Sequence, residues 1–222
     1  AMREEFKKKY AGEISSGKYD TRDLQRLDSD ESYARCFLRT LRSKNDVAKA
    51  VDVINECFLF RKDYGIWDLT EDSFSDEVKG KNGLYFKGKD KQGFKVLYID
   101  VSANVAKNDE EKVQVRKYCA YILEKHHRET PEEMVTCVFD MHKASTMSFN
   151  KEMSSFFLTC FAVYYPGFLS YMINYEMPML LGAVWSVVSS FLNADQKKKV
   201  LAVKKNKIKD YLPEDNLWDF MK

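Results

Sequence analysis

The stretch MSSFFLTCFAVYYPGFLSYMINYEMPMLLGAVWSVVSSFL, residues 153–192, decides the fold class, because Glu176 is its only charged residue although 32% of the chain is charged. Pro166 and Pro178 divide it, and proline ends a helix. The pattern predicts a helix, then a strand near residues 171–176, then a second helix. Each piece is shorter than the roughly 18 apolar residues of a membrane span. We therefore expect the buried part of a globular α/β domain.

The last piece, residues 179–192, is apolar around most of its circumference, whereas a surface helix needs only one apolar stripe. Both faces of this helix must therefore meet apolar material. One interpretation is a helix packed between other parts of the protein. The other is a gate that covers an apolar ligand on one side and faces solvent or a bilayer on the other. The pattern leaves both open.

A cluster of lysines follows this helix: Lys197, Lys198, Lys199, Lys204, Lys205, Lys207 and Lys209, against Asp195. Such a cluster is ordinarily a solvated face. Beside an exposed apolar helix it also suits an anionic membrane surface. On that second interpretation Lys197, Lys198, Lys204 and Lys205 form a membrane-facing basic patch.

The rest of the chain predicts a helical module followed by a sheet. Apolar residues recur at helical spacing from residue 20 to 64. Strands are expected at 84–86, 95–101 and 135–140, with a Gly-bounded turn at 88–93 and a helix at 109–128. Alternating strands and helices indicate a mixed, largely parallel sheet. We expect a helical module at residues 1–66 and an α/β domain at 67–222.

Composition limits the partners and the compartment. The formal net charge is +2, from 36 Lys and Arg against 34 Asp and Glu, so no global field attracts nucleic acid. Five widely spaced cysteines predict reduced thiols, and the charged N-terminus lacks a secretory signal. We expect a cytoplasmic monomer that binds no nucleic acid.

Catalytic and metal-binding patterns are weak. The three histidines occur without an HExxH pattern, and no cysteine pair has CxxC spacing. Cys137 and His142 could form a nucleophile and base, but Cys137 lies in an apolar strand where an inert thiol is expected. Nucleotide and hydrolase motifs are missing. We expect no enzyme activity, no cofactor and no metal.

Several short motifs together resemble those of the CRAL-TRIO family. Phe37-Leu38-Arg39 and Asp46-Val47-Ala48-Lys49-Ala50 resemble its FLR and DVxKA runs, and Phe60-Arg61-Lys62-Asp63-Tyr64-Gly65 its WRKDYG segment. Residues 90–96 resemble the DxxGRPV turn, and Tyr164-Tyr165-Pro166 with residues 173–178 resembles YYPE followed by IINAP. Within the family, the chain is most similar to the N-terminal domain of motile sperm domain-containing proteins.

The resemblance implies a lipid pocket on the sheet, closed by a gate helix at 179–192. The implied pocket and gate residues are Phe157, Phe161, Tyr175, Leu181, Trp185 and Val188. Aromatic residues such as Phe157 could equally be ordinary core. A headgroup phosphate would be held by Arg61, Lys62 and Lys199. Gly167 and Gln196 replace the Glu and Thr of the phosphatidylinositol-binding members, so we expect no strong preference for that lipid.

The expected function is lipid binding, with transfer between membranes or sensing, and transient contact with a membrane surface. In the full-length protein that membrane would be the endoplasmic reticulum or a lipid droplet. One alternative is a protein-interaction module that keeps the fold but exchanges no ligand. A lipid-turnover enzyme is a further alternative, and it would need an acid-base pair inside the pocket.

Overall fold

The computed structural model describes residues 1–222 except 41, 82, 104–105, 131–132, 146–150, 180–181, 183–185 and 187–193. The chain divides into two compact units. The first unit consists of Ala1–Ser73, Ala120–Glu132 and Phe156–Phe168, and the second of Phe74–Cys119, Glu133–Ser155 and Leu169–Lys222. The first unit therefore contains the predicted helical module and adds two later segments to it.

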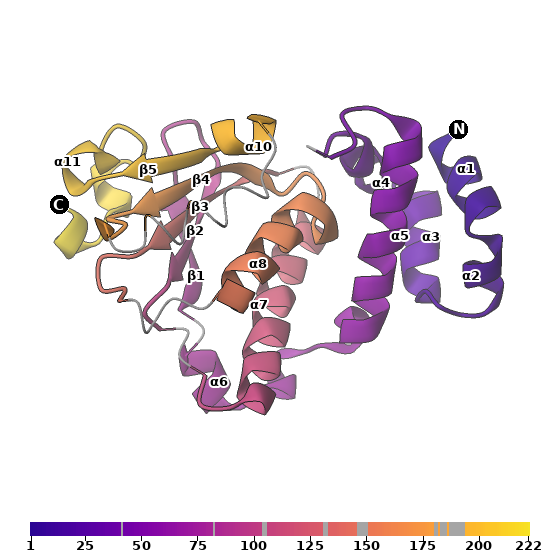
Figure 1. Ribbon diagram of the computed structural model, residues 1–222, viewed down its shortest axis with the longest axis horizontal. Helices are drawn as coiled ribbons and strands as arrows, with labels where there is room; N and C mark the ends of the chain where they lie inside the picture. The colour runs from indigo at the N-terminus through magenta and orange to yellow at the C-terminus, as the bar shows by residue number, and fades with distance from the viewer. Residues whose placement is uncertain are drawn as a thin grey trace. The chain divides into compact units, whose positions relative to one another are not determined.

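The N-terminal module is helical, as the spacing predicts (Figure 1). Its helices are α1 (Met2–Lys9), α2 (Ala11–Ser15), α3 (Thr21–Ser29), α4 (Glu31–Leu38) and α5 (Val47–Tyr64), followed by the short 3-10 turns η1 (Ile66–Asp68) and η2 (Glu71–Ser73). The Asp46 carboxylate caps α5 by accepting a hydrogen bond from the Lys49 N–H at 3.1 Å. Gly65 ends it with a φ of 62°.

The core of this module consists of the apolar residues that recur at helical spacing, joined by Phe6 from α1. Its buried members include Phe6, Leu27, Tyr33, Phe37, Val51, Ile54 and Phe58. Aromatic rings meet edge to face, for example Phe6 and Phe58 with centroids 5.6 Å apart.

Two later helical segments complete the first unit. One is the C-terminal half of α7 (Asp109–Glu129), and the other follows α8 (Lys151–Thr159) as the π-helical turn η3 (Cys160–Tyr164). The Tyr165 N–H reaches back five residues to the Cys160 carbonyl at 2.8 Å. The Tyr165 hydroxyl donates to the Ala120 carbonyl at 2.7 Å and so ties the two segments together.

The second unit is built on a five-stranded sheet in the order β1-β2-β3-β4-β5. The strands are β1 (Leu84–Lys89), β2 (Lys95–Asp100), β3 (Val135–Asp140), β4 (Leu169–Tyr175) and β5 (Val200–Val203). β1 pairs antiparallel with β2, and the other pairs are parallel. The predicted mixed, largely parallel α/β class is therefore confirmed.

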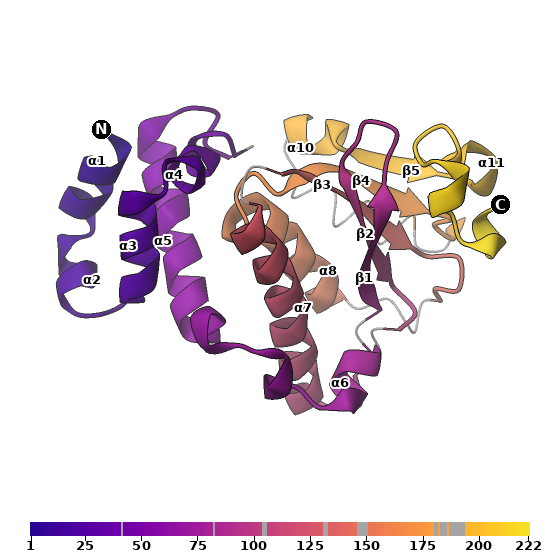
Figure 2. The ribbon, with the colours of Figure 1, turned by 180° about the vertical axis from the view of Figure 1, so that it is seen from behind.

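The strand order explains how the sheet is covered. Strands β2, β3 and β4 follow one another in the same direction, so right-handed crossovers place the parts of α7 and α8 that belong to the second unit, residues 109–119 and 151–155, on one face (Figures 1 and 2). The segment after β5 covers the opposite face. It contains α11 (Lys205–Ile208), η4 (Glu214–Asn216) and η5 (Asp219–Met221), and it buries Ile208, Leu212, Leu217 and Met221 against the sheet. The short helices α6 (Asp76–Lys81) and α10 (Ala194–Lys198) precede β1 and β5.

Asp90 organises the turn between β1 and β2. One carboxylate oxygen accepts hydrogen bonds from the Gln92 and Phe94 N–H groups, both at 2.9 Å. The other accepts from the Thr136 hydroxyl at 2.6 Å and the Tyr171 hydroxyl at 2.8 Å. The DxxG turn of the sequence is therefore fastened to both β3 and β4.

Candidate functional site

The candidate site is the face of the sheet opposite to the one that the C-terminal segment covers. Successive strand residues point to opposite faces, and Val96 and Tyr98 pack against the C-terminal segment. Leu97 and Ile99 therefore point to the other face. On this face the strand register forms two rows of residues across β2, β3 and β4. One row is Leu97, Cys137 and Met172, and the other is Ile99, Phe139 and Asn174. All six residues are buried. The result is an apolar platform.

Asn174 is the polar exception in this platform. Asn174 is only 1% exposed. Neither its amide oxygen nor its amide nitrogen has a hydrogen-bond partner among the described residues. The sequence prediction did not single it out, because an asparagine in a strand looks unremarkable until its burial is known.

Tyr175, predicted to line the pocket, lies on the opposite face from Asn174. Its ring belongs to the cluster under the C-terminal segment, together with Val203 and Ile208. Strand alternation explains this placement, because neighbouring residues of β4 cannot share a face.

Phe157 and Phe161, the other described pocket candidates, lie in the first unit and are buried. Their rings stack at 6.2 Å, and Phe161 stacks in turn on Phe168 at 5.7 Å. These contacts fit an ordinary core, and the assignment of both residues to a pocket wall stays a prediction. The remaining candidates, Leu181, Trp185 and Val188, lie outside the described residues, as does most of the predicted gate helix.

Lys199 immediately precedes β5 and is half-buried in the second unit. Its ammonium donates to the Leu169 carbonyl at 3.0 Å, and burial lowers the pKa of Lys199. A lysine held in this way has two further donor hydrogens for an anion. Its predicted role as a headgroup ligand stays a prediction.

Arg61 lies in the first unit with its guanidinium fully buried between two carboxylates. Its Nε donates to Asp23 at 2.6 Å, while Nη1 and Nη2 donate to Glu124 at 2.6 and 2.9 Å. Burial raises the pKa of Glu124, but the charge and hydrogen bonds of Arg61 outweigh it and hold that pKa at about 2. A phosphate that used Arg61 would have to displace a carboxylate from it. The neighbouring Lys62 is exposed.

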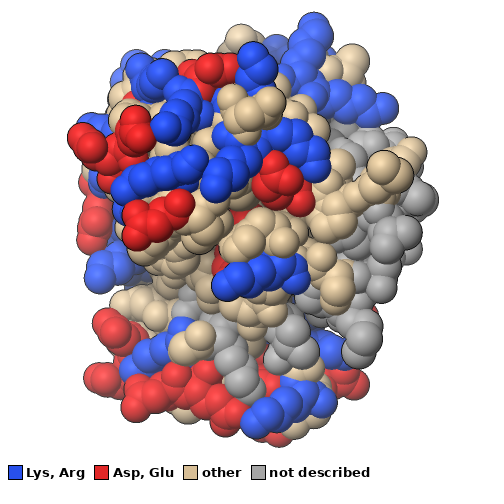
Figure 3. Space-filling view, turned by 90° about the vertical axis from the view of Figure 1, so that its left-hand side faces the viewer, with Lys and Arg blue, Asp and Glu red and all other residues tan. Residues whose placement is uncertain are grey.

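The predicted basic patch is exposed at Lys197, Lys198, Lys204 and Lys205. Figure 3 shows basic side chains gathered over one part of the surface at the C-terminal end of the second unit. Lys204 contacts Glu176 at 3.4 Å, with exposed fractions of 63% and 29%, so the one acidic residue of the apolar stretch is set against this patch. A membrane-facing role for the patch stays a prediction.

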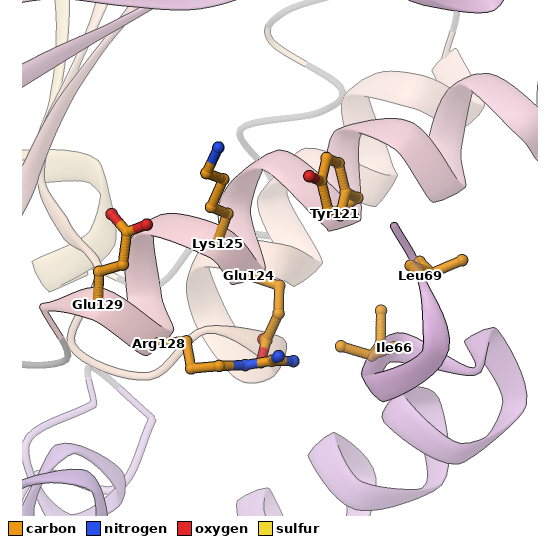
Figure 4. A pocket seen from close by; sticks show the side chains of 7 residues that line it. All are labelled: Ile66, Leu69, Tyr121, Glu124, Lys125, Arg128 and Glu129. Atoms are coloured by element: carbon orange, nitrogen blue, oxygen red, sulfur yellow. The ribbon is translucent and has the colours of Figure 1, made fainter. Parts of the chain in front are cut away.

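A surface cavity of about 290 Å³ lies in the first unit between η1 and the C-terminal half of α7. Figure 4 shows Ile66 and Leu69 across from Glu124 and Arg128. Arg128 donates to Glu124 through Nη2 at 2.9 Å, and Lys125 and Glu129 line the cavity as well. Because most of its lining is charged, this cavity does not suit a lipid tail.

The residues with catalytic side chains do not assemble into a reactive group in the described part of the chain. Burial raises the pKa of the Cys137 thiol well above its ordinary value, which opposes formation of the reactive thiolate. His142 binds the Asp140 carboxylate through Nδ1 at 2.7 Å and stacks on Phe220. Among the described residues, no group of three metal-binding side chains occurs, and no helix has the length and apolar composition of a membrane span.

A mixed sheet with a buried apolar face, preceded in the sequence by a helical module, is consistent with the CRAL-TRIO fold, which binds small lipophilic ligands. The chain belongs to the CRAL/TRIO domain family, whose model matches residues 79–222. Members of this family are generally lipid-binding carriers rather than enzymes.

Two relatives support the assignment. The CRAL-TRIO domain-containing protein C3H8.02 of Schizosaccharomyces pombe is 27% identical over 151 residues, which cover 66% of this chain and 33% of that protein. The match thus spans about a third of the length of that relative. The crystal structure of Sfh5 superimposes with a TM-score of 0.69 and 16% identity, over 95% of this chain and 82% of that one. At this identity the likeness concerns the fold.

Proposed function

We propose that this chain binds one lipid molecule against the buried apolar platform of its sheet and transfers it between membranes or senses it. The observation that carries the proposal is the row of buried side chains around Cys137, in a family that holds small lipophilic ligands. Burial of a lipid chain contributes roughly 0.8 kcal/mol per CH₂ group. Affinity is thus readily supplied by the tail, and selectivity must come from polar groups.

Lys62 of the first unit and Lys199 of the second unit are each proposed as a ligand of a lipid phosphate. Lys199 supports this because its amine is half-buried and already anchored to the Leu169 carbonyl. Two cations would compensate the charge of a phosphodiester. The gate at residues 179–192 and the patch Lys197, Lys198, Lys204 and Lys205 would meet an anionic membrane during exchange.

We further propose that the chain is of the motile sperm domain-containing type and works as a cytoplasmic monomer at the endoplasmic reticulum or a lipid droplet. Its motif order supports this subtype. Cell fractionation tests this location: it measures how much of the protein is bound to lipid droplets and to endoplasmic reticulum membranes.

Mass spectrometry of organic extracts from the purified protein tests the proposal directly. We expect one lipid per protein molecule. Repeated absence of lipid, with the protein folded and its core filled, would favour the protein-interaction module. The double variant Lys62→Ala with Lys199→Ala is expected to lose phospholipid and keep its thermal unfolding temperature. Phospholipid loading that stays unchanged in this variant would show that the ligand is neutral or bound elsewhere.

A further inference from the structure

Asn174 carries a buried amide that has no hydrogen-bond partner among the described residues. The residue is 1% exposed, and among the described residues it is the one side chain with two unbonded buried polar atoms. Each unsatisfied group costs on the order of 1–3 kcal/mol. Thr136 of β3 is equally buried, and its hydroxyl is bonded to Asp90 at 2.6 Å. A comparable polar group in the same sheet is therefore satisfied, whereas no described residue satisfies the amide of Asn174.

The position of Asn174 connects it to the proposed lipid site. It stands in register with Phe139 on one side and Ala202 on the other. In the preceding row lie Cys137 and Met172, which are buried and apolar. A group that approaches Asn174 thus crosses an apolar surface. An ion would lose its hydration there without a counter-charge from these neighbours.

The two open atoms define the chemistry of the partner. The amide nitrogen donates and the amide oxygen accepts. A hydroxyl can accept from the first and donate to the second. An ether or ester oxygen only accepts, and an ionised carboxylate would face the amide oxygen with like partial charge.

We propose that Asn174 binds the hydroxyl of an uncharged lipid, which makes it the specificity-determining residue of the apolar platform. This inference rests on the proposed lipid-binding function alone, and it names a neutral lipid alcohol as the ligand in place of a phospholipid. The hydroxyl gains two hydrogen bonds, and the buried amide loses its unsatisfied state. Selectivity for the alcohol over the matching hydrocarbon follows.

The test uses two fluorescent probes that differ in one group: 10-(1-pyrenyl)decanol, which carries a terminal hydroxyl, and 1-decylpyrene, which does not. We expect the wild-type chain to bind the alcohol about tenfold more tightly, as two modest net hydrogen bonds imply. The variant Asn174→Leu, similar in volume, is expected to bind both probes equally. Met172→Leu on the same face is the matched control and should keep the preference.

The outcomes separate the inference from the proposal beneath it. If neither probe binds the wild-type chain, lipid binding itself fails, and the inference with it. If both bind the wild-type chain equally, lipid binding stands, but a structural water or nothing fills the site at Asn174, and the inference is overturned. Equal preference in the wild type and Asn174→Leu overturns it too. Should Asn174→Leu not fold, Asn174→Val and the wild-type preference decide the question.

Discussion

The guanidinium of Arg61 binds the carboxylate of Glu124 end on, with Nη1–Oε2 at 2.6 Å and Nη2–Oε1 at 2.9 Å, and neither side chain is more than 3% exposed. Asp23 holds the third donor, Nε, of the same guanidinium. Arg61 on α5 thereby joins α3 to the C-terminal half of α7 within the first unit. The buried ion pair of Arg61 and Glu124 therefore holds helices of the first unit together.

Removal of the Glu124 charge should be costly. In Glu124→Gln, Arg61 keeps a buried charge with less compensation, and we expect a loss of about 3 kcal/mol in the free energy of unfolding. Urea denaturation measures it. The matched control is Glu56→Gln, which breaks an exposed two-bond pair with Arg42 and should cost less than about 1 kcal/mol. Equal losses in both variants would contradict the role of burial.

His127 should make the protein sensitive to acid. Burial lowers the pKa of His127 to about 4, against about 6.5 in an unfolded chain. The unfolded chain therefore binds the proton more readily. The contribution of neutral His127 to the free energy of unfolding is fully present above pH 6.5 and is lost as the pH falls toward 4. At pH 5 the loss is on the order of 2 kcal/mol. His127→Phe should flatten the unfolding free energy between pH 6.5 and 5, and an unchanged slope would refute this.

Asp90 should contribute more to the free energy of unfolding than an ordinary turn residue, because its carboxylate accepts hydrogen bonds from four donors. In Asp90→Ala the Thr136 and Tyr171 hydroxyls lose this acceptor, and we expect a loss of about 3 kcal/mol in thermal or urea unfolding. Asp90→Asn keeps one acceptor oxygen and should lose less. The idea fails if the alanine and asparagine variants are equally stable.

Gly167 should resist substitution for a backbone reason. Its φ is 77°, and a Cβ there would lie 3.2 Å from the Cys36 sulfur. Gly167→Ala should therefore lose about 2 kcal/mol of unfolding free energy. Gly17 has a similar φ of 71° with open space around it, so Gly17→Ala should show the conformational cost alone. Similar losses of unfolding free energy in the two variants would show that contact with Cys36 adds nothing to the cost.

The periodicity of the sequence predicted the helices between residues 20 and 64, α7 and the central strands, because apolar spacing reflects burial, but it did not predict α1, α2 or α6. It predicted α7 to within a residue and all of β3. It missed β5, since the run Val200–Val203 is short and lies between lysines whose charge dominates that segment. The π turn at Cys160–Tyr164 was missed as well, because one wider turn barely changes the spacing of apolar residues.

The site was harder to predict than the fold. A motif points to Arg61, but its partners Asp23 and Glu124 are 38 and 63 residues away in sequence, and only the folded chain brings them together. Likewise, the pattern MINYE shows an asparagine next to a tyrosine without showing which of the two faces the platform. Register with β3 decides that.

The cover of the sheet face that carries Val96, Tyr98 and Val138 imposes an order on synthesis. Lys87 of β1 donates to the Leu217 carbonyl and the Tyr98 hydroxyl to the Asn216 carbonyl, contacts that span 130 and 118 residues. The hairpin of β1 and β2 is local and can pair early, whereas its covering residues leave the ribosome more than a hundred residues later. Because synthesis adds about 5–20 residues per second, this apolar face stays uncovered for several seconds. During this interval Val96 and Val138 are open to a chaperone or to a second nascent chain.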